Sequence, residues 1–285
     1  MSTPPTRILR DLLDRPGIIR SLAPHDAFTA RIMQDAGVEL LFLGGFGVSA
    51  STLGLPDVGL LTMTEMAEAV RRISGCLSVP LIADGDTGHG DVHNVARTVR
   101  EFERAGASGI LLEDQAHPKR CGHFSGKQVV SVEEMLTRLR AALDARSNPD
   151  FVIFARTDAL AIEGVDRAIE RANRYGELGA DICFVEAPRT HEELRQIGKE
   201  VSYPQLANML LGGVTPILSA DELEALGFKI VVDPVTSLAA CGAAVRSLTQ
   251  TFLETGRLDK TPLDLLSFDE IKQILGLDDI LNRDR

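Results

Sequence analysis

The chain has 285 residues, 44% of them hydrophobic, and a formal net charge of −11 at pH 7. The length supports one or two domains with a sizeable core. The charge argues against nucleic-acid binding, although a local cluster of cations would still accept a small anion. No apolar run reaches the length of a membrane-spanning helix, so no membrane partner is expected.

The four cysteines, Cys76, Cys121, Cys183 and Cys241, are spread along the chain. They form no CxxC pair and no zinc-type spacing. The first residues lack the basic head and the apolar stretch of a secretory signal. Free thiols without an export signal are typical of a reducing compartment, so we expect a cytoplasmic protein.

Eight short apolar runs follow one another, and most end in a polar residue or glycine. Each is continuous rather than alternating, which is typical of strands covered on both faces in a parallel sheet. The runs are GIIRSLAP (17–24), ELLFLGG (39–45), VPLIADGD (79–86), ASGILLEDQ (107–115), FVIFARTD (151–158), ADICFVEA (180–187), PQLANM (204–209) and KIVVDP (229–234).

Helical periodicity separates these runs. In residues 91–106 apolar side chains recur at Val92, Val95 and Val99, and residues 164–180 repeat the pattern. Eight strands that alternate with helices over about 250 residues fit a single α/β domain, a (β/α)8 TIM barrel. A doubly wound open sheet is the competing architecture.

We therefore expect one barrel domain over residues 1–285. Its last part, about 255–285, has helical periodicity after the eighth repeat. We interpret this part as a C-terminal helical appendage that packs on a neighbouring subunit.

Carboxylates gather at the ends of the predicted strands. Asp84 and Asp86 end one run and Glu113 ends the next. In a barrel these ends meet at one mouth, where the carboxylates would repel one another unless a cation joined them. Oxygen ligands without clustered histidines suit Mg²⁺ or Mn²⁺ rather than Zn²⁺. Any single Asp is better explained as a helix N-cap or a solvated turn residue, but the three acids together favour a metal site. The later runs end with Arg156, Glu186 and Asn208.

The segment KRCGH, residues 119–123, places a thiol beside cations. Lys119 and Arg120 precede Cys121, and neighbouring cations lower the pKa of a thiol. Such a thiol can donate a proton to a carbanion as a general acid. Lys119 and His123 would bind a carboxylate while nearby glycines let the loop close. The alternative is an exposed basic loop with an incidental cysteine.

Several separated blocks resemble, in order, the isocitrate lyase/phosphoenolpyruvate mutase superfamily over most of residues 15–240. KRCGH is similar to the signature of its lyase side. The blocks DGDTG and NMLLGGVTP resemble the petal death protein and the 2-alkylmalate and 2,3-dimethylmalate lyases, and the short 2-methylisocitrate lyases come next. The other matching blocks are GLPDVGLLTMTEM, LLEDQ, ARTDAL and FVEAP.

The resemblance implies a barrel whose last helix is exchanged between subunits, giving a homo-oligomer, a dimer of helix-swapped dimers. It also implies Mg²⁺ held near Asp84 and Asp86, with Glu113 contributing through water and Asp57 nearby. The small carboxylic acid substrate would lie on the metal and on the backbone around Gly44, Gly45 and Phe46. The other implied contacts are Arg156 on the substrate carboxylate, Glu186 and Asn208 on the opposite wall, and Lys119, Arg120, Cys121, Gly122 and His123 on the loop.

The resemblance implies a carbon–carbon lyase acting on a 2-hydroxy acid, namely a 2-alkylmalate, 2,3-dimethylmalate or 2-methylisocitrate, and the chemistry of these residues agrees with it. Chelation of Mg²⁺ makes the hydroxyl easier to deprotonate, and cleavage of the C2–C3 bond leaves pyruvate or a related keto acid. Cys121 protonates the departing carbanion. Some family members carry serine in place of Gly44 and tyrosine in place of Phe42, so the base that takes the hydroxyl proton is unassigned.

Three alternatives stay open. Oxaloacetate hydrolase or decarboxylase activity would use the same metal on a smaller acid. A phosphonate P–C bond enzyme, similar to carboxyphosphonoenolpyruvate mutase, would share the barrel but not the KRCGH cysteine. A non-enzymatic scaffold would not need the charged residues. Leu210 and Leu211 supply no cation, which favours a small, apolar substrate over a tricarboxylate.

Overall fold

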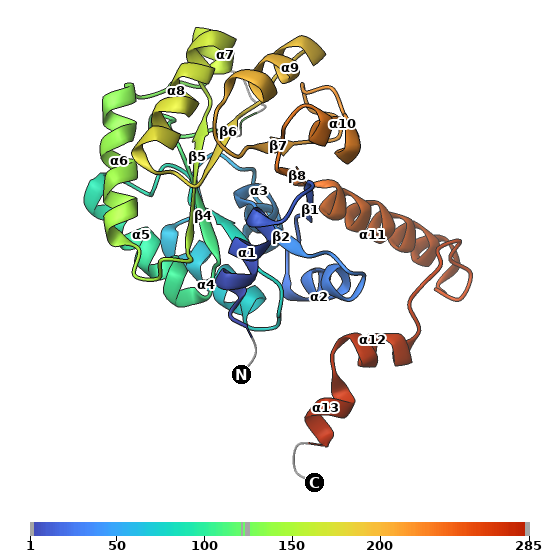
Figure 1. Cartoon of the computed structure of the whole chain (residues 1–285). Helices are drawn as coiled ribbons and strands as arrows, with labels where there is room; N and C mark the ends of the chain where they lie inside the picture. Colours follow the sequence, from blue (N-terminus) through green and yellow to red (C-terminus); the bar gives the residue numbers. More distant parts are fainter. Residues whose placement is uncertain (1–2, 121, 123–125, 283–285) are drawn as a thin grey trace.

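Eight parallel strands form a barrel with helices between them (Figure 1). The computed structural model describes residues 3–120, 122 and 126–282. The strands are hydrogen-bonded in the order β6-β5-β4-β3-β2-β1-β8-β7, and a bridge between Cys183 and Gln205 joins β6 to β7. Their bounds are β1 Ile19–Leu22, β2 Leu40–Leu43, β3 Leu81–Asp84, β4 Gly109–Glu113, β5 Val152–Thr157, β6 Ile182–Val185, β7 Leu206–Asn208 and β8 Ile230–Asp233. The TIM barrel predicted from the apolar runs is confirmed.

Helices cover most of the outer face of the barrel and occupy the connections between strands. The longer ones up to the eighth strand are α1 Pro5–Asp14, α2 Ala27–Asp35, α4 Met63–Ser74, α5 Val92–Ala105, α6 Val132–Ala145, α8 Val165–Leu178, α9 His191–Glu200 and α10 Ala220–Ala225. Three are short: α3 Gly45–Val48 and η1 Ser49–Leu53 follow β2 one after the other, and α7 Leu160–Glu163 follows β5. After β8 come α11 Thr236–Thr255, α12 Phe268–Ile274 and α13 Leu277–Leu281. No helix in the described ranges is long and apolar enough to cross a membrane.

The strands away from β1 and β8 are mostly apolar because both of their faces are buried, whereas β1 and β8 alternate between buried and more exposed residues. In β3, Ile82 points into the barrel interior, whereas Leu81 and Ala83 pack under the surrounding helices. Leu9 and Leu12 of α1 join the interior cluster and close one end of the barrel. The opposite end, where the carboxyl ends of the strands meet, stays open to a ligand.

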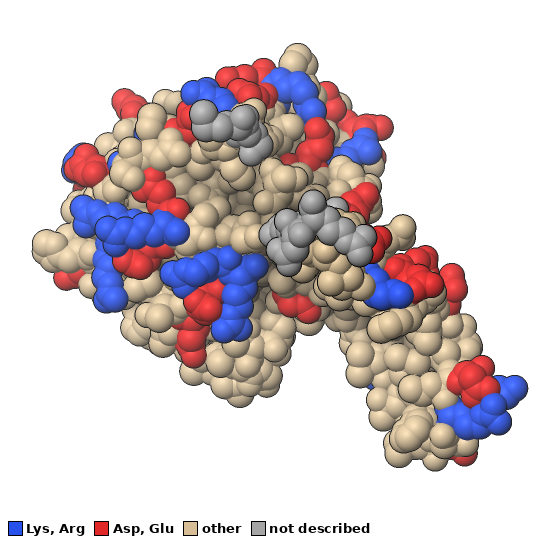
Figure 2. Space-filling view, turned by 90° about the horizontal axis from the view of Figure 1, so that it is seen from below, with Lys and Arg blue, Asp and Glu red and all other residues tan. Residues whose placement is uncertain are grey.

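Helix α11 extends away from the barrel (Figure 1) and contains no buried residue within the described chain. Val245, Phe252 and Leu253 expose apolar side chains on it, and Leu253 is 78% exposed. Figure 2 shows this arm standing out from the body of the protein, with much of its surface free of charge. A lone apolar helix of this length is costly in water, so it requires a covering surface.

A groove of about 720 Å³ lies on the outside of β1 and β8, where the barrel has less helical cover. Leu22 of β1 is 40% exposed beside it. An exposed apolar helix and a pair of strands with less helical cover are both compatible with the predicted helix exchange. Exchange itself remains a prediction.

We expect the native protein to be an oligomer, heavier than its chain mass of 30.8 kDa. Leu253→Asp places a charge on the exposed apolar face of α11 and should shift the assembly toward smaller species, measured by light scattering. Gln250→Glu adds one charge to the same helix at an exposed polar position and should leave the mass unchanged. A monomeric native protein would refute the expectation.

Candidate active site

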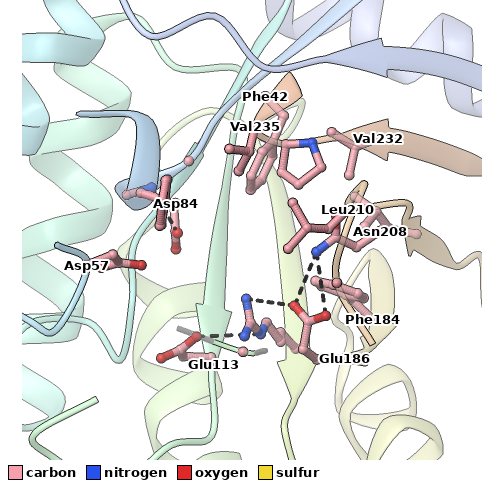
Figure 3. A pocket seen from close by; sticks show the side chains of 18 of the residues that line it. Phe42, Asp57, Asp84, Glu113, Phe184, Glu186, Asn208, Leu210, Val232 and Val235 are labelled. Atoms are coloured by element: carbon pink, nitrogen blue, oxygen red, sulfur yellow. Dashed lines mark hydrogen bonds and ion pairs between the residues drawn. The ribbon is translucent and has the colours of Figure 1, made fainter. Parts of the chain in front are cut away.

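A cavity of about 380 Å³ opens at the carboxyl ends of the strands (Figure 3). Acidic residues lie on one side of it, an arginine–glutamate pair on another and apolar side chains on a third. Its lining includes most of the predicted site residues, namely Gly44, Gly45, Phe46, Asp57, Asp84, Glu113, Lys119, Arg120, Gly122, Arg156, Glu186 and Asn208. Asp86 lies beside it, in contact with Lys119. Cys121 and His123 lie outside the described residues.

Backbone amides orient the acid that ends β3. The N–H groups of Gly45 and Asp86 donate to the two carboxylate oxygens of Asp84, at 3.1 and 3.0 Å. Asp86 itself has a φ of 49°, in the left-handed region that few residues other than glycine adopt. Such strain persists where the surrounding structure over-determines it, commonly at functional sites.

Lys119 lies inside a cluster of acids, which we name the carboxylate cluster: Asp57, Asp84, Asp86 and Glu113. Its Nζ is 2.6 Å from Asp57 Oδ1 and 2.6 Å from Asp86 Oδ1, and the residue is 5% exposed. Burial by itself would lower the pKa of Lys119, but the surrounding carboxylates outweigh it and raise the pKa. Lys119 therefore stays charged and partly neutralises the cluster.

One ammonium does not balance the cluster. Burial raises the pKa of Asp86 to about 6, even though Lys119 opposes the shift. Burial likewise raises the pKa of Glu113 well above its usual value, and its Oε1 atom is buried without a hydrogen-bond partner among the described residues. Burial is the largest cause of both shifts, and the neighbouring cations offset it only in part.

The donor chemistry of the cluster fits a divalent ion such as Mg²⁺. All its donors are carboxylate oxygens, which are the ligands that hard cations prefer. Within residues 3–120, 122 and 126–282 no three His, Cys, Asp or Glu side chains are spaced to hold an ion. The Lys119 ammonium lies among the acids of the cluster.

Arg156 is the central cation of the second side of the cavity, the charged wall formed by the arginine–glutamate pair. Its Nε and Nη2 donate to the two oxygens of Asp158, at 2.9 and 3.1 Å, and its Nη1 lies 3.1 Å from Glu186 Oε2. The guanidinium also lies over the Phe184 ring, 5.4 Å from its centre. Burial would lower the pKa of Arg156, but Asp158, Glu186 and Glu113 raise it well above its ordinary value. The result is a permanently charged, oriented fork suited to a carboxylate.

Asn208 completes this wall. Its Nδ2 lies 3.5 Å from each oxygen of Glu186, a distance at which the interaction is weak. Its Oδ1 is buried and has no hydrogen-bond partner among the described residues. That oxygen is an acceptor that a hydroxyl group of a ligand would satisfy.

Apolar side chains form the third wall, labelled in part in Figure 3. Phe42, Phe184, Leu206, Leu210 and Val232 line the cavity there. The described lining offers no cation on this wall. A ligand with a short hydrocarbon branch would bury it here at a gain of about 0.8 kcal/mol per CH₂ group.

Gly122 brings the loop into direct contact with the charged wall. A Cβ atom at this position would lie 2.3 Å from Arg156 Nη2 and 2.6 Å from Glu186 Cγ. The neighbouring Arg120 is fixed through its backbone, which exchanges two hydrogen bonds of 2.9 Å with the buried Gln115 side chain. The described residues of the loop thus lie over the cavity.

Two residues of this arrangement, Gln115 and Lys127, were not predicted as site residues. Asp158, which follows Arg156 in the run FVIFARTD, is recognised in the sequence as a charged residue at a strand end but was given no role there. Gln115 likewise follows the acids that end β4. For Lys127 the sequence offered no signal, because its partners lie on another strand and across the loop.

We expect Gly122→Ala to destabilise the protein by about 1–3 kcal/mol, because the added methyl group overlaps Arg156 and Glu186. Denaturant unfolding would measure the loss. Gly44→Ala is the matched control: the nearest atom to its Cβ is Phe42 Cε1 at 3.4 Å, and the backbone has an ordinary φ of −85°. Equal losses for the two variants would contradict the close contact.

Comparisons with known proteins show the family to which this chain belongs. Residues 9–253 match the phosphoenolpyruvate phosphomutase family. The chain is 45% identical to 2,3-dimethylmalate lyase of Eubacterium barkeri, covering 95% of this chain and 94% of that protein. It is 42% identical to chloroplastic carboxyvinyl-carboxyphosphonate phosphorylmutase of Arabidopsis thaliana, covering 94% of this chain and 80% of that protein. It is 41% identical to 2-methylisocitrate lyase of Aeropyrum pernix, covering 98% of this chain and 90% of that protein.

Solved structures that resemble the chain belong to the same superfamily. A structure of oxaloacetate acetylhydrolase with the inhibitor 3,3-difluorooxalacetate matches with a TM-score of 0.93 at 35% identity, over 99% of this chain and 97% of that one. A structure of 2,3-dimethylmalate lyase matches with a TM-score of 0.91 at 33% identity, over 99% of this chain and 94% of that one. The chain therefore belongs to the phosphoenolpyruvate phosphomutase family and is a carbon–carbon lyase of the PEP mutase/isocitrate lyase superfamily.

Proposed function

We propose that the enzyme cleaves a 2-alkylmalate, with 2,3-dimethylmalate as the first candidate, into pyruvate or a related keto acid and a carboxylic acid. The observation that carries this substrate class is the apolar wall of Phe42, Phe184, Leu206, Leu210 and Val232 beside the charged one. Methyl groups of a dialkylated malate would be buried there. Similarity to a 2,3-dimethylmalate lyase supports the same choice.

Mg²⁺ would be held by the carboxylate cluster, with Mn²⁺ as a substitute. When bound, it would supply a Lewis acid that lowers the pKa of the substrate hydroxyl. Arg156 would bind the carboxylate that remains with the keto acid, since its guanidinium already faces the cavity as a fixed cation. Asn208 would accept a hydrogen bond from the substrate through its unpartnered oxygen.

The loop would handle the departing fragment. Breaking the C2–C3 bond leaves a carbanion whose charge is delocalised into its own carboxylate. Lys119 and His123 would stabilise that charge. Cys121 would donate the proton that converts the fragment to a carboxylic acid, and would act as the base in the reverse condensation.

A tricarboxylate fits the cavity less well. Its additional carboxylate would lie against the apolar wall or beside Glu186, whose side chain is almost fully buried and acidic. Placing an unpaired charge there costs more than placing a methyl group. We therefore rank 2-methylisocitrate below the alkylmalates.

Oxaloacetate hydrolysis is the second candidate, because the structure superposes on oxaloacetate acetylhydrolase over nearly its whole length. That reaction would add water to give oxalate and acetate, and it leaves the apolar wall without a partner. A phosphonate P–C bond reaction is a weaker alternative, supported by the similarity to a phosphorylmutase.

The first test is turnover of 2,3-dimethylmalate, 2-methylisocitrate, isocitrate and oxaloacetate with Mg²⁺, followed by keto-acid or oxalate release. We expect the highest kcat/KM with the alkylmalate and a loss of at least about 100-fold in Cys121→Ser, because general acid catalysis typically contributes that much. Cys241→Ser, at an exposed cysteine of α11, is the control. Turnover of oxaloacetate alone, unaffected by Cys121→Ser, would establish the hydrolase instead.

Mg²⁺ should stabilise the protein without substrate. At an Mg²⁺ concentration of about 100 Kd the gain is about 2.7 kcal/mol, visible as a rise in melting temperature. Asp84→Asn should abolish the rise, and Lys119→Met should enlarge it by removing the competing ammonium. Asp144→Asn, at an exposed acid of α6, should respond like the native protein. An undiminished rise in Asp84→Asn would place the ion elsewhere.

A further inference from the structure

Lys127 is a lysine buried beneath the loop that carries the predicted catalytic cysteine. Its Nζ donates to the carbonyl oxygen of Gly122 at 2.5 Å and to Asp158 Oδ1 at 2.7 Å. The Lys127 side chain is 2% exposed and that of Asp158 is fully buried. A buried ion pair is a poor way to gain stability, because removing both charges from water offsets most of their attraction. Its presence here therefore invites a role in the site.

Asp158 connects Lys127 to the substrate-binding arginine. The carboxylate accepts from Lys127 through Oδ1 and from Arg156 through both oxygens. Its backbone N–H donates to the buried Asp114 at 2.9 Å, which prevents the chain at this strand end from shifting. Burial would raise the pKa of Asp158, but Arg156 and Lys127 lower it to about 2. The link thus stays charged throughout the pH range of enzymes.

The other contact of Lys127 fixes the middle of the loop. Gly122 lies so close to Arg156 and Glu186 that no side chain fits between them. The two ends of the loop have other anchors: Gln115 holds the backbone of Arg120, and the N–H of Ala116 donates to the carbonyl of Gln128 at 2.8 Å. The contact with Gly122 is made by the Lys127 ammonium.

We propose that Lys127 is a positioning residue that ties the Gly122 backbone to the Asp158–Arg156 pair and so fixes the loop backbone at Gly122 relative to the cation that would bind the substrate carboxylate. A compact ammonium suits this task, since it donates in separate directions to a carbonyl and a carboxylate. The expected effect on catalysis rests on the proposed lyase function. The expected fixing of the Gly122 backbone does not depend on that function.

The test compares Lys127→Met with the native enzyme. Arg156 keeps its bonds to Asp158 and Glu186, so KM for the alkylmalate should change by less than about threefold, whereas kcat should fall by about 100-fold through misplacement of the proton donor. Lys229→Met is the matched control: this lysine donates to backbone carbonyls of Arg15 and Gly17, far from the cavity. It should lower the melting temperature and leave both kinetic constants unchanged.

Hydrogen–deuterium exchange gives a readout that needs no turnover. In Lys127→Met the amides of residues 119–129 should exchange faster than in the native protein, and in Lys229→Met they should not. If the native enzyme cleaves no hydroxy acid, the lyase proposal fails while exchange still decides the role of Lys127. If Lys127→Met does not fold, Lys127→Gln replaces it, and we again expect a lowered kcat with an almost unchanged KM. A folded Lys127→Met variant with unchanged kcat and unchanged hydrogen–deuterium exchange would overturn the proposal. An equal loss of kcat in Lys229→Met would overturn it as well.

Discussion

The mouth of this barrel depends on buried cations that neutralise buried acids. Lys119 lies among the carboxylate cluster, and Arg156 and Lys127 converge on Asp158. Without these cations the acids would take up protons or move toward water, because an unpaired buried carboxylate costs several kcal/mol. Burial raises the pKa values of Asp86 and Glu113 even though Lys119 and Arg156 oppose the shifts, so these cations offset the burial of the two acids only in part.

The barrel makes this concentration of charge possible because its strands are fixed from both faces. Side chains such as Ile82 fill the interior and Leu81 packs under the helices, so the ends of β3 and its neighbours have little freedom to separate under repulsion. Behind the mouth, Asp114 accepts hydrogen bonds from Thr157, from Tyr175 and from the backbone of Asp158. The charged residues thus sit on a rigid frame, and preorganised charges of this kind stabilise a transition state best.

The family shares this frame across different chemistries. The relatives and structures most similar to the chain include lyases, a phosphorylmutase and an acetylhydrolase, all matched over nearly the full barrel. What distinguishes their reactions must therefore lie in the walls of the cavity and in the loop above it. In this chain those parts are an apolar wall around Leu210 and a loop whose described residues are held by Gln115 and Lys127.

The apolar runs of the sequence predicted the barrel, with a doubly wound sheet as the alternative, and most of the described residues that line its mouth. Continuous apolar runs that end in Asp84, Glu113 or Arg156 predict strands buried on both faces with polar groups at one edge, since period and burial are local properties of a chain. The roles assigned to those residues stay predictions. Only the tertiary structure decided that Lys119 pairs with the acids, that Gly122 contacts Arg156, and that Lys127 reaches Asp158 across the loop. These contacts join residues far apart in sequence, and their distances follow from how strands and loop pack, which no spacing along the chain encodes.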